Sequence, residues 1–223
     1  MATSESGTPR KRSSRGEQTR TRILEAAMET IAELGLRGVT HREVARRAGV
    51  QLSLTTYYFR DIEELIRETF ALFSVRSRPN YETVWSEVFA YLESFPRSEL
   101  RKVTVKQDVC DGLAQRATDY LVSRVMENPV GLAVEQTLFT AARQTPELRQ
   151  LADAHRASLL QPLMHFCSHF NREDPEVDAE LLLDVMTTLE YATLPSVEED
   201  LDPGRLQTLI RRQIGWIMGI RRA

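Results

Sequence analysis

The sequence predicts an all-α protein, with a small N-terminal helix-turn-helix domain and a larger C-terminal helical bundle. Apolar residues recur at three- and four-residue spacing along most of the chain, which is typical of amphipathic helices. Prolines fall mostly near the expected starts of helices or between them. No strand-like alternation continues for long, and no internal repeat is found. A chain of 223 residues can hold a small domain joined to a larger one.

Charge is divided unevenly along the chain. Residues 1–60 carry eleven Arg and Lys against six Asp and Glu, whereas the remaining residues carry 18 basic against 26 acidic side chains. A basic front on an acidic body favours contact between the front and a polyanion such as nucleic acid. A solvated basic arm has the same charge balance, so charge alone leaves both interpretations open.

The composition favours a soluble cytoplasmic protein. No apolar run approaches the roughly 18 residues that indicate a membrane span, and the polar first segment does not resemble a secretory signal. Cys110 and Cys167 are the two cysteines, too few for a disulfide framework or a CxxC zinc site. We therefore expect no membrane partner, no metal and no cofactor.

The chain is expected to begin with a basic arm. Residues 1–18 lack apolar periodicity and are predicted to be disordered. An amphipathic helix is expected from Thr19 to near Gly35. Basic arms of this kind can reach a minor groove or neighbouring phosphates. The candidate DNA contacts in the arm are Arg10, Lys11, Arg12 and Arg15.

A helix-turn-helix follows this first helix. Thr40 and Glu43 have the spacing of a capping box, in which the hydroxyl accepts a backbone N–H and the Glu side chain reaches back. Gly49 is expected to end the short helix, and the next helix begins about three residues later, near Leu52 or Ser53. Two short helices joined by a tight turn that contains glycine predict a helix-turn-helix. Its second helix enters the major groove of DNA.

Tyr57, Tyr58 and Phe59 are adjacent, and on a helix successive side chains point about 100° apart. Phe59 is expected in the core, which leaves the two tyrosines for other surfaces. A tyrosine hydroxyl can bind a phosphate, and its ring can lie against sugar or a thymine methyl group. The alternative is that one tyrosine packs inside the small domain and the other is half exposed.

Residues 19–65 resemble the DNA-binding domain of the TetR family of bacterial transcriptional repressors. The resemblance rests on the first helix, on "GLRGVTHREVARRAGV", on "TTYYF" and on "IEEL". It implies a homodimer, a palindromic operator in double-stranded DNA, and a C-terminal domain whose small-molecule ligand releases the DNA. Beyond these residues, the all-helical pattern and the length fit the family.

The resemblance also implies roles for single residues. Thr40, Thr56 and Tyr58 are expected to contact phosphates, and Tyr57 the groove wall. Thr55 and Thr56 stand where family members often have Leu-Tyr, and Ile62 stands where a Lys is common, so single phosphate contacts differ from the family pattern. The residues expected to read base edges are Gln51, Leu52, Ser53 and Leu54.

The remaining chain, 66–223, is expected to be a helical ligand-binding and dimerisation domain that follows a DNA-binding domain at 19–65. Pro162 lies inside one helical pattern and is expected to kink or split it. The candidate helices are 61–77, 80–95, 104–127, 129–143, 146–170, 176–193 and 203–220.

Segment 80–143 contains many residues of the kind that line ligand pockets, which are mostly apolar with a few polar groups. Ordinary helical core has the same composition, so a packed core is the alternative for each of them. The candidate ligand-binding residues are Trp85, Phe89, Asp108, Tyr120, Glu135 and Phe139.

A dimer interface is expected in 146–170 and 176–193. Leu181, Leu182 and Leu183 cover about 200° of a helix, which is more than one core face needs. The second face is expected to pack against a second copy in an isologous four-helix contact. A deeply buried monomer core is the alternative. The candidate interface residues are Leu159, Leu160, Leu163, Leu182, Leu183 and Met186.

Two functions fit these observations. The first is a repressor released by a ligand, and the second is a ligand-independent architectural DNA-binding protein of the same fold. They differ in whether a cavity exists between the helices of 80–143. An enzyme is the distant alternative, because we find no nucleophile motif, no glycine-rich phosphate loop and no Glu-x-x-His pair.

Overall fold

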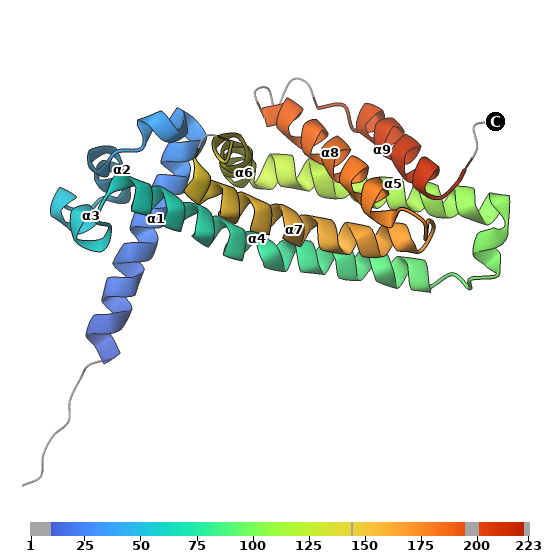
Figure 1. Ribbon diagram of the computed structural model, residues 1–223, viewed down its shortest axis with the longest axis horizontal. Coiled ribbons are helices and arrows are strands. Elements are labelled where there is room, and N and C mark those ends of the chain that lie inside the picture. Colours follow the sequence, from blue (N-terminus) through green and yellow to red (C-terminus); the bar gives the residue numbers. More distant parts are fainter. Residues whose placement is uncertain (1–9, 144, 195–200, 221–223) are drawn as a thin grey trace, which may run out of the picture. The chain divides into compact units, whose positions relative to one another are not determined.

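The computed structural model describes residues 10–143, 145–194 and 201–220, and this part of the chain contains helices and connections but no strand. It divides into two compact units between Phe73 and Ser74, whereas the expected boundary followed residue 65. The boundary falls inside α4, which therefore contributes residues to both units. The helices (Figure 1) are α1 (Arg10–Gly38), α2 (His41–Ala48), α3 (Leu52–Tyr58), α4 (Ile62–Glu93), the short 3-10 helix η1 (Glu99–Arg101), α5 (Val103–Glu127), α6 (Pro129–Ala141), α7 (Pro146–Ser168), α8 (Pro175–Thr193) and α9 (Pro203–Ile217).

Helix α1 begins at Arg10, nine residues before the expected start at Thr19. Residues 10–18 are mostly Arg, Lys, Glu, Gln and Ser, and adding such residues to an existing helix costs little. The helical geometry is interrupted at Gly35, where φ is 65°, near the expected end. Of the expected arm, residues 1–9 lie outside the described residues, as do the side chains of Arg10, Lys11 and Arg12.

The predicted helix-turn-helix is confirmed in α2 and α3. The Thr40 hydroxyl accepts the Glu43 N–H at 3.1 Å, as half of the expected capping box. The Glu43 carboxylate accepts from the guanidinium of Arg46 at 2.9 Å, where a reach back to the cap was expected. Gly49 has a φ of 63° and donates its N–H to the carbonyls at the end of α2, so it ends the helix as expected.

The first unit is held by a small apolar core and by three arginines at its edge. Phe59 and Phe70 are fully buried, with Ile23, Val44 and Leu65. Around this core, Arg22 donates to the carbonyl of Ala48 at 2.6 Å, Arg47 pairs with Glu33 at 2.7 Å, and Arg20 pairs with Glu68 at 2.8 Å. These contacts tie α1 to α2 and to the start of α4.

In the second unit, α5 packs along α9 and α7 packs along α8 (Figure 1). Helix α4 was expected as two helices separated at Pro79, and α7 was expected to kink or split at Pro162. Each proline lies inside one continuous helix, so neither helix is split into two. Pro79 is exposed, so water can bind the carbonyl that its missing N–H leaves free. The core of this unit includes Leu121, Leu132, Phe166 and Ile210.

The position of Phe59 gives a stability test. Replacement by Ala removes a fully buried ring from the first unit, so we expect Phe59→Ala to lower the free energy of unfolding by about 3–5 kcal/mol. The matched variant Tyr57→Ala removes a ring that is 78% exposed, and a change within about 0.5 kcal/mol is expected. Urea unfolding measures both values. Equal losses in the two variants would contradict the assignment of Phe59 as the core residue of this segment.

Candidate functional site

The first candidate site is the outer face of α3. Tyr57 is 78% exposed and Leu52 is 49% exposed, although both are large apolar or aromatic side chains. Tyr58 is half buried, and its ring meets that of Tyr57 edge to face at 5.1 Å. Leu54 is also half buried. Gln51, Ser53 and Thr56 are exposed, and so is Thr40 at the start of α2.

Thr55 departs from the apolar residue that is common in the family, and the structure explains how it is accommodated. Its side chain is fully buried on the inner face of α3. The hydroxyl donates to the carbonyl of Leu52 at 2.8 Å, which satisfies it without a tertiary partner. Threonine in place of an apolar residue at position 55 therefore changes a contact in the core and not the outer face of α3.

Arg15, the remaining described candidate of the basic segment, is exposed on α1.

The second candidate site is a cavity of about 120 Å³ inside the second unit. Helices α4 to α9 all contribute to its wall, which is apolar over most of its area and polar at one end. The polar end consists of Tyr81, Tyr120, Arg124, Glu135, Thr187 and Glu190. The apolar wall consists of Val84, Trp85, Val88, Leu113, Ala117, Leu159, Leu163, Phe166, Leu182, Leu183, Met186, Ile210 and Ile214, beside the stem of Arg116.

Of the six residues expected to bind a ligand, the cavity wall contains Trp85, Tyr120 and Glu135. Three lie elsewhere. Phe89 packs beside Trp85, with ring centroids 5.7 Å apart, and touches His165 on its other side. Asp108 is on the exposed face of α5, and Phe139 borders a separate depression. The expectation is corrected for these three, because proximity in sequence does not show which face of a helix turns inward.

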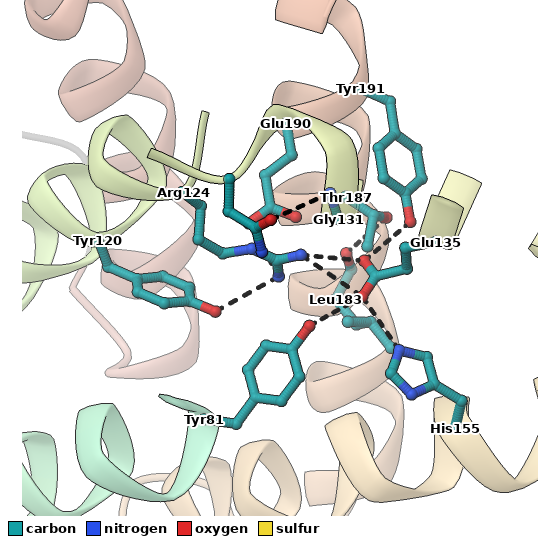
Figure 2. A network of polar contacts seen from close by, with 11 residues as sticks. Tyr81, Tyr120, Arg124, Gly131, Glu135, His155, Leu183, Thr187, Glu190 and Tyr191 are labelled. Atoms are coloured by element: carbon teal, nitrogen blue, oxygen red, sulfur yellow. Dashed lines mark hydrogen bonds and ion pairs between the residues drawn. The ribbon is translucent and has the colours of Figure 1, made fainter. Parts of the chain in front are cut away.

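Four helices of the second unit bring a polar side chain to one buried carboxylate, that of Glu135 on a fifth helix (Figure 2). Tyr81 of α4 donates to it at 2.8 Å and Tyr191 of α8 at 3.0 Å. The imidazole Nε2 of His155 on α7 lies 3.0 Å away, and the guanidinium of Arg124 on α5 is 3.4 Å away. Glu135 itself belongs to α6, so each of α4 to α8 contributes one group.

These partners keep Glu135 ionised. Burial by itself would raise the pKa of its carboxyl group, but the hydrogen bond from His155 and the charge of Arg124 outweigh burial and lower the pKa to about 2. Burial also raises the pKa of Tyr81 and of Tyr191, so both hydroxyls remain protonated donors. The charge on Glu135 is therefore permanent at neutral pH.

Glu190 is a second buried carboxyl group, and its surroundings differ from those of Glu135. Arg124 faces it across 3.5 Å and is shared with Glu135. Burial raises the pKa of Glu190 to about 7; the charge of Arg124 opposes this shift and the charge of Glu135 adds to it. The Arg124 guanidinium also donates to the hydroxyl of Tyr120 at 3.3 Å. Glu190 thus titrates near neutral pH, inside the cavity wall.

Four of the six residues expected at the dimer interface are buried inside one chain, and two are half buried. Leu159, Leu163, Leu182 and Leu183 are at most 7% exposed in the single chain, and all four line the cavity. Leu160 and Met186 pack against the same core. Leu181 is the member of the leucine run that faces outward, at 53% exposed. Of the three consecutive leucines, Leu182 and Leu183 therefore face the interior of their own chain, and Leu181 lies at the surface.

Sequence reasoning missed most of the polar end of the cavity. Tyr81, Arg124, Thr187 and Glu190 of this end were not among the candidates, nor were His155 and Tyr191, which contact Glu135. One usable signal was present: Arg124 stands between Leu121 and Val125 on the inner face of its helix, where a charged side chain needs a partner. The partner itself could not be read from the sequence, because Glu135 belongs to another helix.

Comparisons with known proteins match segments of both units. Residues 23–69 match the family model for bacterial regulatory proteins of the tetR family, and residues 107–215 match a tetracyclin repressor-like C-terminal domain. The HTH-type transcriptional regulator BetI of Escherichia coli O139:H28 is 38% identical over 50 residues, which are 22% of this chain. The matched segment spans only 26% of BetI.

Solved structures resemble the whole fold. A TetR-family transcriptional regulator from Mesorhizobium loti has a TM-score of 0.68 at 15% identity, over 92% of this chain and 98% of its own. A transcriptional regulator from Rhodococcus has a TM-score of 0.63 at 20% identity, over 90% and 96%. The multidrug binding protein EbrR, solved with ethidium, has a TM-score of 0.57 at 23% identity, over 88% and 98%.

A helix-turn-helix unit followed by a helical unit is an architecture of DNA-binding regulators. The two family models together cover most of this chain. The protein belongs to the TetR family of transcriptional regulators. None of the helices in the described ranges is both long enough and apolar enough to cross a membrane.

The raised pKa of Glu190 gives a test by pH. The folded chain keeps a proton that the unfolded chain releases at the ordinary pKa of 4.5, so the free energy of unfolding should fall as pH rises from 4.5 to 7. The contribution of this group is at most about 3 kcal/mol. We expect Glu190→Gln to lose this fall, as measured by urea unfolding at pH 5 and pH 8.

The control for this test is Glu180→Gln, which changes an exposed carboxyl group on the same helix. It should keep the pH dependence of the unaltered chain. If Glu190→Gln and Glu180→Gln show the same dependence, Glu190 does not hold a proton in the folded state.

Proposed function

We propose that the protein is a repressor that binds a palindromic operator as a homodimer and leaves it when a small molecule occupies the cavity of the second unit. The observation that carries this proposal is the cavity, because its polar end is assembled from several helices. An architectural DNA-binding protein has no use for a buried cavity with placed polar groups. This observation favours the ligand-released repressor over the ligand-independent alternative.

The DNA-binding role rests on the outer face of α3. Tyr57 is exposed although burial of its aromatic ring would be stabilising, and Leu52 is exposed on the same short helix. In a helix-turn-helix the second helix enters the major groove, where Leu52 and Leu54 can meet thymine methyl groups and Gln51 and Ser53 can bind base edges. Thr40, Thr56 and Tyr58 contact phosphates in this proposal, as do Arg10, Lys11, Arg12 and Arg15.

The dimer is proposed to form through α8 and α9. These helices pack together and expose large apolar side chains, namely Val177 and Leu181 on α8 and Trp216 on α9, at 54%, 53% and 59%. Exposed apolar groups of this size indicate an interaction surface. A second copy would cover them with the same surface, as in an isologous contact. Two copies then present two α3 helices to successive major grooves.

A neighbouring structure supports the binding of a small molecule. EbrR, which has the same fold, was solved with ethidium and with proflavin. Helix α4 begins beside the helix-turn-helix in the sequence and carries Tyr81 and Trp85 of the cavity wall. In this proposal, occupancy of the cavity shifts α4 and favours a conformation with lower affinity for DNA.

The DNA-binding proposal is tested with a duplex selected by this protein from a random library. The enriched sequence should be a palindrome with half-sites about 10 base pairs apart. Tyr57→Ala should weaken binding about tenfold, or about 1.4 kcal/mol, because the hydroxyl and ring contacts are lost. Fluorescence anisotropy measures the affinity.

Two comparisons make this experiment specific. Tyr57→Phe removes only the hydroxyl and should have a smaller effect than Tyr57→Ala. Arg205→Ala removes an exposed positive charge from α9 and should bind like the unaltered chain. An enriched sequence without two-fold symmetry, or full affinity in Tyr57→Ala, would contradict the proposed mode of binding.

The dimer is tested by sedimentation of the chain without DNA. We expect a species of twice the 25.5 kDa mass of one chain. The double variant Leu181→Glu and Trp216→Glu should sediment as a monomer, because it would bury charges at the interface. Val75→Glu changes an equally exposed apolar residue on α4 and should remain a dimer. A monomeric unaltered chain, or a dimeric double variant, would overturn the proposed interface.

A further inference from the structure

The cavity wall carries two carboxyl groups and two guanidinium groups, and the guanidinium of Arg116 lies over the ring of Tyr91, 3.7 Å from its centroid. Two carboxyl groups, Glu135 and Glu190, line its polar end beside one guanidinium, that of Arg124. Glu135 already has four partners within 3.4 Å. Glu190 has the longer contact with Arg124, at 3.5 Å, and shares that guanidinium with Glu135. Glu190 is therefore the acidic group with the least compensation in the cavity wall.

The size of the cavity limits what it can hold. Drug-sized ligands occupy pockets of about 300–1,000 Å³, whereas an apolar cavity of about 150 Å³ holds one benzene molecule. The cavity here is about 120 Å³, which corresponds to one six-membered ring. Aromatic side chains border this space, among them Tyr81, Trp85, Tyr120 and Phe166. Aromatic faces attract cations, most strongly where water is excluded.

We infer that the cavity takes an organic cation of about one six-membered ring, with the carboxylate of Glu190 as its counter-ion. This inference rests on the proposed function and names the ligand class of the same site. A cation gives Glu190 the positive partner that Arg124 provides only in part. An anion would instead compete with two carboxylates for Arg124. A neutral ring would fill the apolar wall and leave Glu190 as it is.

Binding of the cation is coupled to a proton. The pKa of about 7 means that close to half of the Glu190 groups are protonated at neutral pH. A cation favours the ionised form, so the carboxylic acid releases its proton to the solvent on binding. The charged and titratable groups around Glu190 are Tyr81 of α4, Tyr120 and Arg124 of α5, Glu135 of α6, His155 of α7 and Tyr191 of α8, while α9 contributes Ile210 and Ile214.

The test uses three probes of one shape and different charge, titrated into the full chain without DNA. N-methylpyridinium carries a permanent positive charge, toluene is its neutral counterpart, and benzoate is an anionic ring. Isothermal titration calorimetry at pH 8 should show N-methylpyridinium binding at least ten times more tightly than the other two. Its affinity should fall about tenfold from pH 8 to pH 6, in proportion to the ionised fraction of Glu190.

Variants separate the counter-ion from the shape of the cavity. Glu190→Gln keeps the size of the side chain and should lose the preference for the cation and the pH dependence, while toluene still binds. Glu180→Gln, on the exposed face of α8, should behave like the unaltered chain. If Glu190→Gln does not fold, the release of protons by the unaltered chain tests the inference. Calorimetry at pH 7 in two buffers of different ionisation enthalpy should show about half a proton released per cation bound.

Each result bears on one proposal. Full cation affinity in Glu190→Gln, absence of proton release, tighter binding of benzoate, or no binding of any probe would overturn the inference. The proposed function has a separate measurement, which is anisotropy of the selected duplex. Should N-methylpyridinium bind with the expected pH dependence but leave the duplex bound, the ligand class stands and the release step of the proposed function is wrong.

Discussion

The second unit depends on the burial of one negative charge. Glu135 is fully inaccessible, and an isolated carboxylate in such a place would cost many kcal/mol. It is tolerated because Tyr81, Arg124, His155 and Tyr191 arrive from four other helices within 3.4 Å. Removing one of these partners would leave the buried charge of Glu135 less compensated. The loss of stability would exceed the stabilisation that the intact contact provides. The positions of α4 to α8 are thus coupled through a single side chain.

That coupling explains why a cavity can persist beside the network. Ordinary apolar packing tends to close small voids, because each lost contact costs dispersion energy. Here the polar end holds the helices at distances set by hydrogen bonds, and the wall between them stays open over about 120 Å³. Arg124 contributes to both, since it binds Glu135 and also faces Glu190 across the cavity end. Network and cavity are therefore one structural arrangement.

The two units are stabilised by different kinds of interaction. The first unit is built from local signals: the cap at Thr40, the left-handed Gly49 and the buried Phe59 follow one another within 20 residues. Its arginines form ion pairs at the edge, which contribute little because water screens them. The second unit depends on contacts between residues far apart in the chain.

The sequence by itself determined the all-α class, the helix-turn-helix and the inward position of Phe59. Those features depend on spacing, caps and a glycine turn, all of which act between neighbouring residues. Of the candidate pocket residues, Trp85, Tyr120 and Glu135 line the cavity and the other three do not, because the sequence does not show which side of a helix turns inward. Only the tertiary structure decided that Leu182 and Leu183 face a cavity of their own chain, and that Glu190 shares Arg124 with Glu135. Burial and pKa depend on partners that lie 11 to 66 residues away and reach the same point only when the helices pack.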